Sequence, residues 1–148
     1  MYSFDAILCS ELLEHVLEPT HALDEFARLL KPGGVVILTA PFASNVMHMA
    51  PYHYCSGFSR HWYEHHLALR GFEIKELSPN GDGYALLWQE ITRLGGVERQ
   101  HGNWAWPLAY AYAILGMLYF KIRSDQRAED LACFGWHCVT IKIEKVTL

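Results

Sequence analysis

Two short apolar runs joined by an amphipathic segment constrain the fold more than any other feature of the sequence. The runs cover residues 4–9 and 35–41, and the second is β-branched and free of charge. Such runs are typical of strands that are buried on both faces of a sheet. Because two strands joined by a crossover helix run in parallel, the sequence predicts a βαβ unit whose parallel sheet is covered by helices.

The segment between the two runs has the start, the period and the end of a helix. Apolar residues recur at helical spacing after Pro19, at Leu23, Phe26, Ala27 and Leu30. Thr20 is the expected N-cap. The stretch Lys31-Pro32-Gly33-Gly34 should end the helix, because proline cannot continue it and glycine supplies a left-handed turn.

The rest of the chain predicts further strands and helices around this unit. Residues 42–58 should form a loop at the carboxyl end of the second strand, where ligands of open α/β sheets bind. The later expected elements are a helix ending at Arg70, a strand over 72–77, a loop over 78–83, helices over 84–94 and 107–122 with a glycine-rich linker at 95–102, and a closing strand over about 134–145.

Composition excludes several classes of protein. The chain has 148 residues, of which 51% are hydrophobic and 19% charged, as expected for one packed domain. Its net charge of −4 leaves no basic field to hold a phosphate backbone, so no nucleic-acid partner is expected. Four cysteines without a CxxC pair, and a start without a signal peptide, predict reduced thiols and a cytoplasmic protein.

Residues 4–41 resemble the middle of class I S-adenosylmethionine-dependent methyltransferases, of the type 11-like group. The resemblance rests on Phe4-Asp5-Ala6-Ile7-Leu8-Cys9-Ser10-Glu11-Leu12-Leu13-Glu14-His15-Val16, Pro19, Leu29-Leu30-Lys31-Pro32-Gly33-Gly34 and Ile37-Leu38-Thr39-Ala40-Pro41. Gly71-Phe72-Glu73-Ile74 resembles the turn into the sixth strand of that family, and the C-terminal strand resembles the antiparallel seventh. The resemblance therefore implies an α/β, partial Rossmann-like sheet made of the last four of seven strands.

The resemblance also implies a divided and incomplete domain. A partial methyltransferase domain is expected over 1–83 and 133–148, with a helical insertion over 84–132 before the final strand. The glycine-rich cofactor loop and the acidic ribose-binding residue of the family have no counterpart here. Polar cofactor groups would then be poorly paired, so we expect this chain alone to bind S-adenosylmethionine weakly or not at all. A truncated enzyme and a sheet completed by a partner chain both stay open.

Site residues follow from the same resemblance. It implies that Cys9 and Ser10 flank the methyl donor, with His15 as the catalytic base and Glu11 orienting the acceptor. Glu11, Glu14 and His15 would also share one side of a helical turn. A similar Glu-x-x-Glu-His holds a divalent cation in small-RNA 2′-O-methyltransferases and in some quinone-biosynthesis O-methyltransferases, and His48 or His53 could add a ligand.

The loop over 42–60 is expected to cover a small-molecule, lipid-linked or sugar-linked acceptor. Its candidate contacts are His48, His53, Tyr54 and Arg60. The alternative is an exposed aromatic loop that packs on the following helix. The choice is open at this point.

Residues 102–120 contain no charged side chain. The helical part after Pro107 would span about 21 Å, against about 30 Å of bilayer hydrocarbon, which disfavours a transmembrane helix. Its tyrosines and tryptophans suit a peripheral membrane contact, and packing on the helix at 84–94 as a lid or dimer face is the competing interpretation. The rival to a methyltransferase is accordingly a non-catalytic, methyltransferase-like interaction module, with or without a membrane contact.

Overall fold

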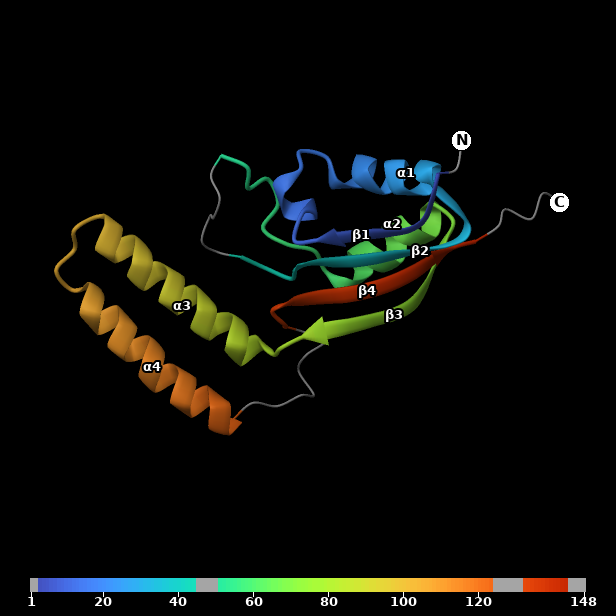
Figure 1. The fold of residues 1–148 in the computed structure, drawn as a ribbon. Helices are drawn as coiled ribbons and strands as arrows, with labels where there is room; N and C mark the ends of the chain where they lie inside the picture. Colours follow the sequence, from blue (N-terminus) through green and yellow to red (C-terminus); the bar gives the residue numbers. More distant parts are fainter. Residues whose placement is uncertain (1–2, 45–50, 124–131, 144–148) are drawn as a thin grey trace.

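The computed structural model describes residues 3–44, 51–123 and 132–143, and it contains one four-stranded sheet with helices (Figure 1). The elements in chain order are β1 (Phe4–Ser10), the 3-10 turn η1 (Leu13–His15), α1 (Pro19–Leu29), β2 (Leu30–Pro41), α2 (Arg60–Leu69), β3 (Phe72–Asn80), α3 (Gly83–Gln100), α4 (Trp106–Arg123) and β4 (Gly135–Lys142).

The sheet has the order β1-β2-β4-β3. β1 and β2 are parallel, whereas β4 lies antiparallel between β2 and β3. Thr39 of β2 is therefore opposite both Ser10 of β1 and His137 of β4. The predicted α/β sheet is confirmed, with its antiparallel closing strand and with α3 and α4 inserted before that strand.

The core lies on the face of the sheet that α1 and α2 cover. β2 contributes Val36, Leu38 and Ala40, and β4 contributes Trp136 and Cys138. Leu23 of α1 and Tyr63 and Leu67 of α2 pack against them. The opposite face carries the alternate side chains, and there Leu8 is 72% exposed and Ile37 is 42% exposed. Burial on one face only leaves the other face available for contacts.

α1 begins two residues earlier than an N-cap at Thr20 would require. Pro19 occupies the first helical turn and Glu18 is the N-cap, without a capping hydrogen bond from its side chain. The prediction of Thr20 as the N-cap was wrong because the fixed φ of proline and its missing N–H suit the first helical position. The turn predicted at Lys31–Gly34 is an irregularity inside β2, where the pairing jumps from Leu30 to Val35.

Two loops predicted from glycine and proline are regular structure instead. α3 runs through Gly95 and Gly96 to Gln100, so the predicted linker at 95–102 was wrong over most of its length. A Cβ on Gly95 would lie 3.4 Å from the Tyr110 ring, so glycine there permits α3 and α4 to pack closely. β3 likewise continues through Pro79, because an edge strand tolerates a residue without a donor.

No helix among residues 3–44, 51–123 and 132–143 combines the length and the apolar character that crossing a bilayer requires. α4 and α3 run side by side and project from one end of the sheet as a hairpin (Figure 1).

Gly57 should be the least replaceable glycine of the chain. Its φ is +150°, and a Cβ would fall inside contact distance of the Phe42 carbonyl oxygen, which belongs to the backbone. We expect Gly57→Ala to lower the free energy of unfolding by about 2 kcal/mol more than Gly102→Ala, because Gly102 has φ +72° but open space around it. Urea unfolding followed by circular dichroism measures both, and equal losses would contradict the clash.

Candidate functional site

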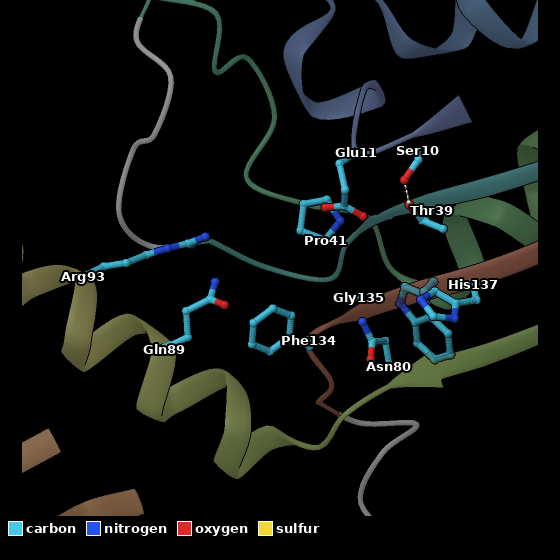
Figure 2. A pocket seen from close by; sticks show the side chains of 11 residues that line it. Ser10, Glu11, Thr39, Pro41, Asn80, Gln89, Arg93, Phe134, Gly135 and His137 are labelled. Atoms are coloured by element: carbon cyan, nitrogen blue, oxygen red, sulfur yellow. Dashed lines mark hydrogen bonds between the residues drawn. The ribbon is translucent and has the colours of Figure 1, made fainter. Parts of the chain in front are cut away.

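A cavity of about 430 Å³ opens where β1, β2 and β3 end and β4 begins (Figure 2). Its lining comes from all four strands, from α3 and from the segments beside them: Ser10, Glu11, Thr39, Pro41, Asn80, Gln89, Arg93, Phe134, Gly135, Trp136 and His137. The site therefore lies at the carboxyl ends of the parallel strands, the edge at which α/β sheets bind ligands.

Ser10, Glu11 and Thr39 form one wall of this pocket. The Ser10 and Thr39 hydroxyl oxygens are 2.8 Å apart, and the Glu11 N–H donates to the Thr39 carbonyl at 2.9 Å. Glu11 has φ +48°, the one described non-glycine residue in the left-handed region. Such a conformation is uncommon for residues with a Cβ and is concentrated at functional sites. The turn after β1 thus presents the Glu11 carboxylate to the cavity.

α3 supplies the facing wall, as Figure 2 shows for Gln89 and Arg93. Arg93 Nη1 donates to Ser44 Oγ and to Glu90 Oε1, both at 2.9 Å. Glu90 is buried, so its charge is compensated by the guanidinium. These bonds join α3 to the segment that follows β2, and they hold Arg93 beside the cavity.

Glu14 and His15 are paired in η1 outside the pocket lining. Glu14 is 1% exposed, its Oε1 is 3.6 Å from His15 Nε2, and its Oε2 has no hydrogen-bond partner in the described part of the chain. Burial raises the pKa of Glu14, the Glu11 charge raises it further, and its backbone hydrogen bond and His15 oppose the shift. His15 Nδ1 is 2.6 Å from the Tyr52 carbonyl, so that nitrogen donates and Nε2 faces the buried carboxyl.

The loop after residue 50 is held to this pair by its backbone. The N–H groups of Tyr54 and Cys55 donate to the Glu14 carbonyl at 2.9 and 3.2 Å. The His15 and His53 rings lie edge to face, with centroids 6.2 Å apart. His53 is therefore close to the base predicted at His15.

Three of the predicted acceptor contacts, His53, Tyr54 and Arg60, do not line the cavity. The Tyr54 side chain is exposed, and Arg60 Nε donates to Glu64 Oε1 at 3.0 Å on α2. His48 lies outside the described residues. Of the predicted site residues that the structure describes, only Ser10 and Glu11 reach the pocket, whereas sequence reasoning missed Asn80, Gln89, Arg93 and His137. A signal was present for Arg93, which follows Glu90 by three residues on one helix face.

The cation site predicted at Glu11, Glu14, His15 and His53 does not form in the described part of the chain, which holds no group of three or more His, Cys, Asp or Glu placed to share a metal ion. The spacing argument assumed an α-helical turn. Instead Glu11 is left-handed and faces the pocket, and Glu14 points inward from a 3-10 turn.

Cys9 is buried in the core, and its pKa is raised to about 11 by burial and by the nearby Glu14 charge. Its thiol therefore stays protonated at neutral pH, and only its backbone is available to a ligand.

Glu14→Gln should stabilise the chain in a pH-dependent way. When the pKa of a carboxyl is raised in the folded state, the protein loses stability as the pH rises above the ordinary pKa of that carboxyl, about 4.5. The amide of Gln does not titrate, and it can donate a hydrogen bond to His15 Nε2. We expect the thermal midpoint of Glu14→Gln to exceed that of the wild type at pH 8, with the difference vanishing towards pH 4. Glu76→Gln, at an exposed position of β3, is the matched control, and a difference that is constant with pH would contradict this interpretation.

Residues 2–77, about half of the chain, match a family model described as a methyltransferase domain. This segment holds β1, η1, α1, β2, α2 and most of β3, and hence the Ser10, Glu11 and Thr39 wall of the pocket.

Curated relatives match over a shorter stretch. The ubiquinone biosynthesis O-methyltransferase of Xanthomonas oryzae pv. oryzae is 57% identical over 37 residues, which are 25% of this chain and 16% of the relative. The enzyme of the same name from Dechloromonas aromatica is 53% identical over 36 residues, 24% of this chain and 16% of the relative. The matched segment spans about a sixth of the length of either relative.

Solved structures share the fold over nearly the whole chain. The putative sarcosine dimethylglycine methyltransferase from Galdieria sulphuraria aligns with a TM-score of 0.53 and 15% identity, over 97% of this chain and 54% of that one. The [4+2]-cyclase SpnF aligns with a TM-score of 0.52 and 18% identity, over 95% and 50%. This chain thus spans about half the length of each. With the family model over residues 2–77 and the sheet order observed here, the chain belongs to the methyltransferase domain family, of the class I S-adenosylmethionine-dependent type.

Proposed function

We propose that this chain supplies the acceptor side of an S-adenosylmethionine-dependent O-methyltransferase. The observation that carries the proposal is the cavity at the ends of β1 and β2, whose Ser10, Glu11 and Thr39 wall lies within the family segment. An oxygen acceptor is supported by the names of the curated relatives, which are ubiquinone biosynthesis O-methyltransferases.

The residues present fit one side of the methyl donor. Ser10 is exposed at the end of β1, and the buried Cys9 would contribute its backbone alone. Bound S-adenosylmethionine supplies an electrophilic methyl group on a sulfonium. This chain spans about half the length of the solved structures that share its fold, and the proposal assigns the rest of the cofactor to further polypeptide.

Methyl transfer to a hydroxyl needs orientation of the acceptor and removal of one proton. Glu11 is the carboxylate placed in the cavity to accept a hydrogen bond from that hydroxyl. His15 lies outside the lining and is the second proposed base, for an acceptor that extends beyond the cavity; a proton on its Nε2 would be stabilised by the Glu14 carboxylate at 3.6 Å. Tyr52 holds the ring from the other side through Nδ1.

The cavity suits a small polar acceptor or the head of a larger one. Its volume lies within the range of small-molecule sites, and Asn80, Gln89, Arg93 and His137 offer hydrogen bonds to a hydroxylated group. The proposed acceptor is a small molecule or a lipid- or sugar-linked one. His53, Tyr54 and Arg60 lie outside the lining, so they would contact only the part of an acceptor that extends beyond the cavity.

Titration with S-adenosylmethionine tests the proposed cofactor site. Nuclear magnetic resonance of the ¹⁵N-labelled chain should show saturable shifts at the amides of residues 9–11 and 39–40, with a dissociation constant on the order of millimolar. α2 is the internal control and should not shift. Micromolar affinity would contradict an incomplete site, and unshifted amides at saturating cofactor would contradict the proposal itself.

Glu11→Gln tests the role of the pocket carboxylate in the catalytically complete protein. We expect kcat to fall by about 100-fold or more with a hydroxyl acceptor, the usual contribution of a general base, while cofactor affinity is unchanged. Glu64→Gln on α2, outside the cavity, is the matched control. A change in KM alone would assign Glu11 to binding.

A second candidate is a non-catalytic, methyltransferase-like module that binds a partner chain. The observation in its favour is β1, which lies at one edge of the described sheet and exposes Leu8 next to Ile37 of β2. An unpaired edge beside an apolar face can accept a strand from another chain and so complete the sheet. Such a module would show no shift at Ser10 in the cofactor titration.

A further inference from the structure

α4 is apolar on two sides, and one of them packs on α3. The row that faces α3 consists of Trp106, Tyr110, Ala113 and Met117, at separations of four, three and four residues. Ala113 is buried, the other three are partly buried, and the Tyr110 ring lies against Gly95. The Arg99 guanidinium lies 5.3 Å from the centre of the Trp106 ring. This row explains the apolar side of α4 that packs on α3.

The second row is exposed to solvent. It consists of Leu108, Tyr112, Leu115, Tyr119 and Ile122, at separations of four, three, four and three residues, and we call it the outer seam. Its side chains are all exposed, from 57% for Tyr119 to 83% for Ile122. A helix that is apolar all round is normally covered on every side. Something other than α3 should therefore cover the outer seam.

The exposed area is large enough for a stable interface. Together with the flanking Leu118, which is 52% exposed, the outer seam presents on the order of 800 Å² of surface, about what each partner buries in a standard protein interface. The largest apolar patch of a typical monomer is about 300–600 Å².

We propose that the outer seam packs against the outer seam of a second copy of this chain, so that two α3–α4 hairpins form a four-helix bundle. The spacing is the 3.5-residue repeat with which helices pack side by side, and α4 already uses it on its other side against α3. In a two-fold symmetric dimer both copies use the same surface, so no outer seam is left exposed to bind a third copy.

A lipid surface fits the outer seam less well. Helices that lie in a membrane interface combine an apolar face with a polar face rich in Lys and Arg. The face of α4 opposite the outer seam is apolar and covered by α3, and the basic residues of the helix, Lys121 and Arg123, stand only at its C-terminal end. The observations therefore favour a helical partner, and vesicle binding becomes an outcome of the test.

Sedimentation of the full 148-residue chain over a range of concentrations tests the proposal. The wild type should be a dimer, and Leu115→Glu, at the centre of the outer seam, should weaken dimerisation at least about 100-fold. Leu115 is 66% exposed and Glu is a comparable helix former, so the variant should keep its circular dichroism spectrum. Leu8→Glu, on the exposed sheet face, is the matched control and should remain dimeric.

Two results in sedimentation would overturn the proposal. One is a wild type that stays monomeric. The other is a dimer that Leu8→Glu abolishes and Leu115→Glu does not, which would place the contact on the sheet.

Cross-linking tests the same dimer contact without introducing a charge into the outer seam. Leu115→Cys should form a covalent dimer with a short bismaleimide, because the centres of the two outer seams meet in either relative orientation of the helices. The wild type and Leu8→Cys measure the background, since Cys9, Cys133 and Cys138 are buried and Cys55 is partly buried. Cross-linking of Leu115→Cys no greater than that of Leu8→Cys would overturn the proposal.

Co-sedimentation with phosphatidylcholine–phosphatidylglycerol vesicles tests whether a lipid surface, and not a second copy of the chain, covers the outer seam. The wild type should stay in the supernatant. A wild type that binds the vesicles as a monomer, with binding lost in Leu115→Glu, would assign the outer seam to lipid and overturn the proposal.

Discussion

The pairing of β2 with β4 is the contact on which the rest of this structure depends. It joins the βαβ unit to the C-terminal strand, with seven paired positions from Val35–Ile141 to Pro41–Gly135. The two strands supply Leu38, Ala40 and Trp136 to the core. At the end of the ladder a Cβ on Gly135 would lie 2.7 Å from the Ala40 carbonyl oxygen, so the close approach needs glycine. β4 enters the sheet there, beside the carboxyl ends of β1 and β2.

This arrangement also determines what surrounds the pocket. Because β4 runs antiparallel between β2 and β3, the chain must leave β3 and enter β4 at the same end of the sheet. The hairpin of α3 and α4 fills that connection, which brings Gln89 and Arg93 to a site otherwise built from strand ends. The pocket therefore combines a wall from the family segment with a wall from the insertion.

The sequence predicted the parts of the fold that depend on local patterns. An uncharged β-branched run identified β2, and helical spacing after Pro19 identified α1. Both were predictable because the spacing of buried residues can be read directly along the sequence. The misjudged elements depend on contacts across the chain. Gly95 continues a helix because Tyr110 packs on it, and Pro79 continues a strand because β3 lies at an edge of the described sheet. Neither neighbour is visible from local composition.

The position of the candidate site could be predicted from the sequence, but most of its lining residues could not. The carboxyl ends of parallel strands could be named from the βαβ pattern, and Ser10 and Glu11 lie there. The grouping of Glu11 with Glu14 and His15 required a helical turn, and the left-handed Glu11 separates the carboxylates instead. Arg93 and His137 come from elements that meet β1 and β2 only through the antiparallel insertion of β4, which no spacing in the sequence encodes.

α3 has two long sides with different neighbours. One side holds Arg93 at the cavity, bonded to Ser44 and Glu90, and the other, at Gly95, packs against Tyr110 of α4. A helix is stiff along its axis, so a displacement of α3 at one side is transmitted to the other. By thermodynamic linkage, a ligand that favours one position of α3 changes the affinity of any partner that favours the same position by an equal factor. α3, which forms one wall of the pocket, thus also connects the pocket with α4.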